Sequence, residues 1–458
     1  MFLAIEWGSV GLQAGQLILS LSILVIMHEL GHYLPARWFK CRVEKFYLFF
    51  DPWFSLFKKK IGDTVYGIGW LPLGGYVKIS GMVDESMDKE QMKQPAQPWE
   101  FRSKPAWQRL IIMIGGVTVN VLLAFFIYAM ILFVWGDRKT PVNSMKYGIW
   151  TTDSLMTEIG LQSGDKIITI NGKAVTYFEN LNAAVLMGNT IELERDGRRV
   201  ELKLPINLIE KLIESKKKRR YFLYPRIPSY VGEYDKSDSS NGKKAGLQKM
   251  DRIVAIDSIP IEFYDQMMPI LSSKKNNNVI LAIERNGQRS NIQAKVDKDG
   301  RIGIPMLIDE EYAQMGVFQI IVKKYNFFSA FPAGVTKAGE KLNNYIDQFK
   351  LLLNPKTGAY KGIGGFRAMG SVFSPNAWNW EQFWNITAFF SIVLAFMNLL
   401  PIPALDGGHV VFTLIEMITG RKPNEKFLEY AQIAGMVLLF GLIIFANAND
   451  WFGWGRGK

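Results

Sequence analysis

Four long apolar stretches stand out along the chain, separated by segments in which polar and apolar residues alternate more closely. A helix needs about 20 mostly apolar residues to cross roughly 30 Å of hydrocarbon. The stretches that satisfy this length are residues 10–39, 110–135, 386–418 and 427–446. The third contains Pro401, Pro403 and Gly407-Gly408, which predict a broken helix. The pattern therefore predicts a polytopic α-helical membrane protein with about four transmembrane helices.

The segment between the second and third stretches contains a repeat of a different kind. Residues 160–171 are echoed by residues 246–257, and each copy is followed by a helix-like run and a strand–turn–strand pattern. The turns are Asp196-Gly197 and Asn286-Gly287, which are strong hairpin signals. Both copies resemble PDZ domains, whose turn of the form Gly-Leu-x-x-Gly-Asp leads into a strand. A single copy could equally be a surface turn before a strand, but two copies with matching hairpins favour two tandem β-rich PDZ-like domains.

Residues 318–353 follow this insert and carry apolar positions at helical spacing with interspersed lysines. This pattern is typical of a helix lying on a membrane surface, and packing against the PDZ-like pair would explain it equally well. The predicted organisation is an N-terminal membrane part (1–136), PDZ-like domain 1 (137–226), PDZ-like domain 2 (227–312), an amphipathic helix with linker (313–384) and a C-terminal membrane part (385–458).

Composition supports a chain that is part membrane and part soluble. Of 458 residues, 48% are hydrophobic and 21% are charged, and the mean hydropathy is +0.05. The formal charge of +12 does not indicate nucleic acid, because the basic residues are dispersed and flank apolar stretches. Basic clusters at 37–45, 102–109 and 421–426 place these three regions in the cytoplasm by the positive-inside rule. Both termini and the PDZ-like insert are then expected outside, in the periplasm or the exterior.

The candidate chemistry lies inside the apolar segments. Cys41 is the one cysteine, which excludes a disulfide framework and a zinc site built from several cysteines. Residues 28–32 match H-E-x-x-H, in which His28 and His32 stand one turn apart on a helix and Glu29 can reach a metal-bound water. Ionisable groups at membrane depth are costly unless they pair, bind metal or line a wet cavity. A satisfied structural pair of histidines is therefore the weaker interpretation.

Two histidines leave a catalytic zinc without its third protein ligand. Asp406 and His409 are the carboxylate and histidine in the third apolar segment that could lie at similar depth. Asp406 precedes two glycines, which suits a bent backbone that directs a carboxylate inward. His409 is the rival ligand.

Several motifs together resemble the site-2 protease family of intramembrane metalloproteases, and closely its bacterial branch of regulators of sigma-E. The motifs are residues 28–32, Gly116-x-x-x-Asn120, the Pro-Leu-Gly-Gly-Tyr-Val-Lys run at 72–78, and Asn-x-x-Pro-x-Pro-x-Leu-Asp-Gly-Gly-His at 398–409. With the PDZ-like insert, the resemblance covers nearly the whole chain.

The resemblance implies a specific set of roles. One Zn²⁺ per chain would be held by His28, His32 and Asp406, with Glu29 as general base and acid and His409 as a neighbour. Residues 67–81 would form a β-hairpin that dips into the membrane.

It also implies substrate contacts by Asn398, Gly74, Gly75 and Tyr76. A tight turn at the two glycines and a helix–helix hydrogen bond from Asn398 are alternatives that the sequence leaves open. The implied substrates are single-pass membrane proteins already trimmed by another protease, such as anti-sigma factors or remnant signal peptides. Peptide C-termini would bind the PDZ-like domains, and the lipid bilayer surrounds the rest.

Two functions from other classes compete with proteolysis. A transporter or channel would also use a broken third helix and a carboxylate at mid-membrane depth. A non-catalytic scaffold would present PDZ domains to partner C-termini. Neither function needs Glu29 beside paired histidines.

Overall fold

The computed structural model describes residues 7–72, 74–82, 95–151, 153–215, 222–236, 238–422 and 424–453. They form two compact units. Unit 1 comprises Met1–Gly136, Lys324–Lys350 and Tyr360–Lys458, and unit 2 comprises Asp137–Lys323 and Leu351–Ala359.

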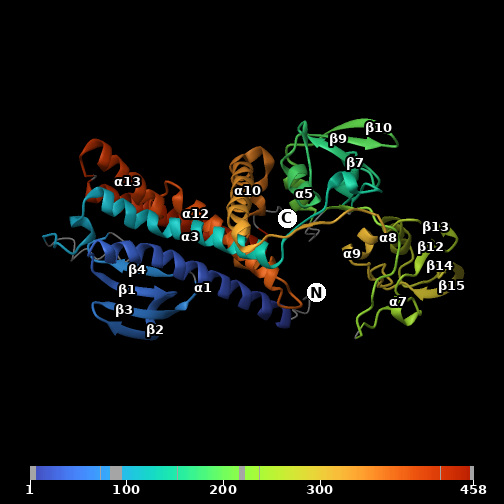
Figure 1. The fold of residues 1–458 in the computed structure, drawn as a ribbon, viewed down its shortest axis with the longest axis horizontal. Helices are drawn as coiled ribbons and strands as arrows, with labels where there is room; N and C mark the ends of the chain where they lie inside the picture. Colours follow the sequence, from blue (N-terminus) through green and yellow to red (C-terminus); the bar gives the residue numbers. More distant parts are fainter. Residues whose placement is uncertain are drawn as a thin grey trace. The chain divides into compact units, whose positions relative to one another are not determined.

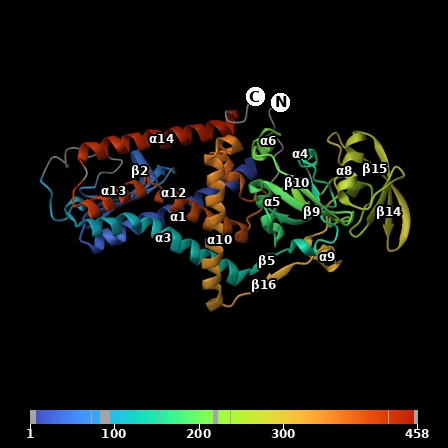
Figure 2. The same cartoon turned by 90° about the horizontal axis from the view of Figure 1, so that it is seen from above.

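Unit 1 is built mainly of long helices (Figures 1 and 2). They are α1 (Trp7–Trp38), α3 (Ala106–Val134), most of α10 (Phe327–Leu353), α11 (Phe366–Ser371), α12 (Trp380–Leu399), α13 (Asp406–Thr419) and α14 (Glu425–Phe452). Among the described residues, α1, α3, α12 and α14 are long and apolar enough to cross a membrane. The four predicted spans are confirmed as helices of this kind, with the third divided between α12 and α13.

The break in the third span has a local cause. Proline lacks a backbone N–H and disfavours helical geometry in the residue before it. Accordingly α12 ends at Leu399, and Leu400, which precedes Pro401, is extended at φ −61° and ψ 143°. The chain turns through the two prolines, and α13 begins at Asp406.

The membrane helices approach closely where glycines face one another. A Cβ built on Gly31 of α1 would collide with the backbone of Gly115 in α3, and a Cβ on Gly115 would collide with the carbonyl of Gly31. Lipid tails are as apolar as the helix surfaces, so the hydrophobic effect does not drive helices together within a membrane. Contacts between small residues instead let the two backbones pack at van der Waals distance. The contact fixes α1 against α3 at the level of the HExxH segment.

A four-stranded sheet lies along α1 (Figure 1). Its strands are β1 (Val43–Leu48), β2 (Phe50–Ile61), β3 (Thr64–Leu71) and β4 (Tyr76–Ile79), in the order β2-β3-β1-β4. The predicted hairpin over 67–81 is wrong, because β3 and β4 do not pair. Each pairs instead with β1, which lies between them with Val43 and Tyr47 buried. The hairpin of this region joins β2 to β3 through Gly62 and Asp63.

Unit 2 contains two small sheets with the same topology. Its strands are β5 (Asp137–Lys139), β6 (Ile149–Thr151), β7 (Lys166–Ile170), β8 (Lys173–Ala174), β9 (Thr190–Arg195), β10 (Arg198–Lys203), β11 (Leu223–Pro225), β12 (Arg252–Ile256), β13 (Ile259–Pro260), β14 (Asn278–Arg285), β15 (Gln288–Lys295) and β16 (Ile321–Lys323). Its helices are α4 (Ser154–Glu158), α5 (Phe178–Met187), α6 (Leu208–Glu214), α7 (Asn241–Lys244), α8 (Tyr264–Ser273) and α9 (Asp309–Gln314). The orders β10-β9-β7-β8 and β15-β14-β12-β13 are equivalent.

The repeat extends to side-chain contacts. Asp165 binds the guanidinium of Arg195 at 2.7 and 2.8 Å, and Asp251 binds that of Arg285 at 2.6 and 2.7 Å. The hydrogen bonds to Asp165 hold the pKa of Arg195 above its ordinary value. The predicted hairpin turns are also present, since Asp196-Gly197 and Asn286-Gly287 all have positive φ.

Candidate metal centre

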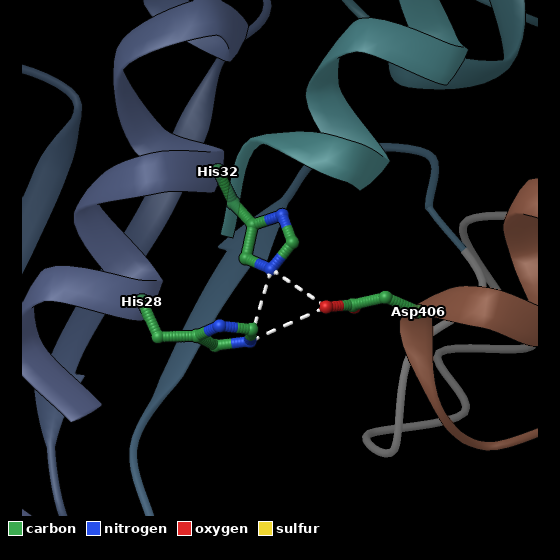
Figure 3. Close-up of side chains that lie close together, drawn as sticks. All are labelled: His28, His32 and Asp406. Carbon is green, nitrogen blue, oxygen red and sulfur yellow. Dashed lines mark hydrogen bonds and ion pairs between the residues drawn. The ribbon is translucent and has the colours of Figure 1, made fainter. Parts of the chain in front are cut away.

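Three side chains from two distant parts of the chain converge in unit 1 (Figure 3). His28 and His32 lie one turn apart on α1, and Asp406 is the first residue of α13. The two Nε2 atoms are 3.3 Å apart, and Oδ2 of Asp406 lies 3.3 Å from each of them. The three atoms therefore form a triangle with equal sides.

This triangle has the dimensions of one face of a zinc site. Tetrahedral ligands at about 2.0–2.1 Å from zinc are about 3.3–3.4 Å from one another. The fourth position of such a site would remain open, as in catalytic zinc centres. The donor set of two imidazoles and a carboxylate suits zinc as well.

The protonation of the histidines is set by what their other nitrogens contact. Nδ1 of His32 lies 2.8 Å from the carbonyl oxygen of Ile112, to which it can only donate. Its Nε2 then has no proton, and the lone pair of this nitrogen faces Asp406. A neutral His32 therefore has no proton on Nε2 to donate to Oδ2 of Asp406, which is a buried oxygen with no hydrogen bond. Electron-rich atoms facing each other in this way call for a shared cation.

Asn120 of α3 completes the same pattern for His28. Its side-chain amide lies 3.2 Å from Nδ1 of His28, and its Oδ1 is buried without a partner. Rotation of this side chain exchanges the two amide atoms, and Oδ1 then accepts from a protonated Nδ1. That exchange satisfies the buried oxygen and frees the lone pair of His28 Nε2 for a metal.

Gly116 provides the space in which the imidazoles meet. A Cβ at this position would lie 2.6 Å from Cε1 and 2.8 Å from Nδ1 of His28, and it would collide with Nε2 of His32. Only glycine lets α3 pass this close to both rings. Asn120 lies one turn further along α3, so the Gly116-x-x-x-Asn120 motif forms one wall of the site.

The position of Asp406 is set by a constrained turn of the backbone. Ala404 has φ 91°, a conformation that residues with a Cβ seldom adopt. Cβ atoms on Gly407 and Gly408 would meet the backbone of Leu400, Ile402 and Pro403, so the glycines let α13 start directly against the preceding turn. The Asp-Gly-Gly sequence is thus explained by packing around the carboxylate.

Glu29 lies between the two histidines in sequence and is 9% exposed. Gly75, just before β4, lies next to it, because a Cβ at this position would lie 3.4 Å from Cγ of Glu29 and 2.6 Å from Cγ1 of Val25. The chain before β4 therefore passes over α1 beside Glu29. Gly74, with φ 150°, precedes it.

The remaining candidate residues are placed as follows. Asn398, near the end of α12, points its amide to within 3.3 Å of Nε2 of His28. Tyr76 donates its hydroxyl to Asp51 at 2.8 Å and stacks on Tyr47, so its side chain is engaged within the sheet. His409 is absent from the described cluster of ligating atoms. Residue 73 of the 72–78 motif lies outside the described residues.

Sequence reasoning missed two contacts of the site. The carbonyl of Ile112 is a backbone group and leaves no sequence signal. The close approach of Gly31 to Gly115 could have been suspected, because both are small residues in predicted spans.

Comparison with known proteins assigns the chain to a family. The model of Peptidase family M50, the site-2 protease family, matches residues 16–442. The chain belongs to peptidase family M50.

Relatives of this M50 peptidase extend over nearly its full length. A regulator of sigma E protease from Haemophilus influenzae is 26% identical, with 95% of this chain and 98% of the relative covered. The metalloprotease MmpA of Caulobacter vibrioides is 26% identical, with 95% and 94% covered. A Vibrio cholerae protein whose name includes the words zinc metalloprotease is 27% identical, with 94% and 97% covered.

These findings make the protein a membrane metalloprotease of the site-2 type whose metal is zinc. They confirm the resemblance found in the sequence, and they favour an enzyme over a transporter or a scaffold.

Proposed function

We propose that this M50 peptidase hydrolyses peptide bonds in or near the transmembrane segment of single-pass membrane proteins. One zinc ion per chain is held by His28, His32 and Asp406. The observation that carries the proposal is the equal 3.3 Å spacing of three ligand atoms from α1 and α13. When bound, zinc supplies a Lewis acid that activates water near neutral pH.

Glu29 performs the proton transfers in this proposal. It takes a proton from the attacking water and gives it to the nitrogen of the leaving amine. Glu29 directly follows His28 on α1, and its carboxylate is close enough to His28, His32 and Asp406 to interact with all three electrostatically. The amide of Asn398 lies next to Nε2 of His28. From there it can hold the substrate backbone near the reacting carbonyl.

A substrate helix hides its peptide bonds in its own hydrogen bonds, so it has to unwind before it is cut. The chain at Gly74, Gly75 and Tyr76 leads into β4, which is an edge strand next to α1. An unwound substrate segment added along β4 would regain its backbone hydrogen bonds and would lie close to Glu29. Gly75, just before β4, then lets the chain pass close to Val25 and Glu29 of α1.

The positive-inside rule places the site toward the cytoplasmic side of a bacterial inner membrane and unit 2 in the periplasm. The two equivalent sheets of unit 2 would act as tandem PDZ-like domains that bind peptide C-termini. They would select substrates already trimmed by another protease, such as anti-sigma factors or remnant signal peptides. The shared topology and the paired Asp–Arg contacts support a true domain repeat.

The test is the Glu29→Gln variant in detergent or in membranes. We expect zinc content equal to wild type by mass spectrometry of the metal, and cleavage of a single-pass reporter reduced by about 10²–10⁴-fold. Glu340→Gln, on an exposed position of α10, is the matched control and should cleave normally. Full cleavage by zinc-loaded Glu29→Gln would refute the role of Glu29.

The same variant can identify substrates. Trapped proteins recovered from membranes with Glu29→Gln should be single-pass proteins with shortened outer domains. Recovery of intact, multi-pass proteins alone would contradict the proposed substrate class.

A further inference from the structure

Helix α3 contributes no ligand to the proposed zinc site, yet it contacts both histidines. Asn120 lies against Nδ1 of His28, and the carbonyl of Ile112 lies against Nδ1 of His32. The remaining ligand, Asp406, belongs to α13, which also packs along α3. The position of Asp406 therefore depends on the contacts that fix α13 against α3.

An ion pair at the far end of α13 provides one fixed point. Nη2 of Arg109 in α3 lies 2.5 Å from Oε1 of Glu416 in α13, and each side chain is only 12% exposed. Nε of Arg109 also donates to the carbonyl of Lys104 at 3.1 Å, which holds the guanidinium in one orientation. The pair is therefore specific in direction as well as in distance.

The stability of the fold does not explain this pair. Placing two charges in a poorly solvated site costs free energy that their attraction often only recovers, and apolar residues of similar size frequently serve as well. Its distinctive property is geometric, because a charge-assisted hydrogen bond tolerates little displacement.

The geometry of α13 shows what such a restraint controls. Glu416 lies ten residues after Asp406, or about 15 Å along the helix at 1.5 Å per residue. Between them Val410 packs in one cluster with Ile112 and Met113 of α3. Apolar contacts of this kind allow sliding, and a slip of α13 by one residue would move Asp406 by about 1.5 Å. A shift of that size would destroy the equal spacing of the three ligand atoms.

We infer that Arg109 and Glu416 are a positioning pair that sets the place of Asp406 relative to His28 and His32. The inference rests on the proposed ligand set. In this arrangement α3 acts as a template that places each of the three ligands through a separate polar contact: Asn120, the Ile112 carbonyl and Arg109.

The experiment titrates Co²⁺ into metal-free full-length protein and records the visible absorption of the bound ion, which reports ligand geometry. The decisive variant is Arg109→Met with Glu416→Met, because a buried ion pair replaced by apolar residues usually leaves a protein folded. We expect a melting temperature close to that of wild type, an altered cobalt spectrum and an affinity about 10–100-fold weaker. Glu416→Gln alone should weaken binding in the same direction.

Two controls separate this inference from the proposed function. Lys350→Gln with Asp347→Asn removes an exposed ion pair of α10 and should leave the cobalt spectrum unchanged. Asp406→Asn should lose most of the binding. If wild type binds no Co²⁺, or Asp406→Asn binds like wild type, the ligand set itself is wrong.

If Asp406→Asn loses binding while the double methionine variant keeps the wild-type spectrum and affinity, only the positioning pair is refuted. A double methionine variant that does not fold would also refute it, because the pair would then serve the fold as a whole.

Discussion

Gly116 is the residue at which the packing of α3 and the chemistry of the site meet. A methyl group there would enter the space where His28 and His32 converge. Neither ring can retreat freely, since the Nδ1 atoms of both contact α3. A side chain at this position would therefore compete directly with the proposed metal binding.

We expect Gly116→Ala to lower zinc content to a small fraction of that of wild type and to abolish proteolysis. The matched control is Gly441→Ala in α14, where a Cβ would meet nothing within 4 Å. Alanine in an open helical position should be neutral or stabilise the helix by about 0.5–1 kcal/mol. Metal analysis of both purified variants checks this, and a fully zinc-loaded Gly116→Ala protein would contradict it.

The partner of His28 gives a second prediction at this scale. If Asn120 accepts a hydrogen bond from Nδ1 of His28, an aspartate can do the same and a leucine cannot. We expect Asn120→Asp to keep zinc and Asn120→Leu to bind it about 10–100-fold more weakly. Competition with a chromophoric chelator measures both affinities. Equal affinities of Asn120→Leu and wild type would show that this contact does not orient the ligand.

At the scale of elements, the break between α12 and α13 places the carboxylate of Asp406 at the start of a new helix. A continuous helix would carry Asp406 on its side, with its backbone groups already paired. The turn at 400–405 instead brings Asp406 to the first position of a new helix, where a carboxylate also interacts favourably with the helix dipole. The strained Ala404 and the packed Gly407 and Gly408 are the structural cost of this placement.

The elements differ in how well the sequence predicted them. The membrane spans were readable because length and apolarity alone define them. The HExxH spacing likewise dictates which face of α1 carries the histidines. β1 was missed, because the six residues of Val43–Leu48 form a short strand directly after a long helix and include Glu44 and Lys45.

Other parts of the site could not be read from sequence for physical reasons. Arg109 was interpreted only as a charge that sets topology, since its pairing with Glu416 depends on how two helices pack 307 residues apart in the chain. The approach of Asp406 to the histidines has the same character. The sequence limited the candidates for the third ligand to Asp406 and His409. The packing of α13 on α3 brings the carboxylate of Asp406 to His28 and His32.

The repeated contact between aspartate and arginine in unit 2 supports a prediction about elements. Asp165 is almost fully buried and holds the start of β7 to Arg195 at the end of β9. Asp165→Asn should lower the stability of the first sheet by about 1.5–3 kcal/mol, because hydrogen bonds to a charged partner are weakened. Hydrogen exchange of β7 and β9 should accelerate, while β12 and β14 keep their protection.

The exposed Asp299 provides the control as Asp299→Asn. Zinc content should stay unchanged in both variants, because the proposed ligands lie in unit 1. Equal acceleration of exchange in both sheets would show that the two halves of unit 2 do not unfold separately.

For the whole molecule, the chain enters and leaves the main body of unit 2 at one point. β5 and β16 are antiparallel partners, with Lys139 directly opposite Ile321. A segment whose ends pair in this way can be removed without stretching the chain on either side. The architecture thus separates a membrane unit that holds the proposed catalytic residues from an insert whose two ends meet. Leu351–Ala359 also belongs to unit 2 and packs against α6, so this segment loses that contact when the insert is removed.

This closure allows a sharp test of the proposed substrate filter. Residues 140–320 would be replaced by Asn-Gly, which forms a two-residue turn suited to an antiparallel pair. We expect the deletion variant to keep its zinc and to cleave an intact precursor nearly as fast as a trimmed one, whereas wild type prefers the trimmed form. The same deletion combined with Glu29→Gln should cleave neither, which excludes a contaminating protease. If the zinc-loaded deletion variant still rejects the intact precursor, selection by length must lie in unit 1, where the edge of β4 beside Glu29 would be the place to look for it.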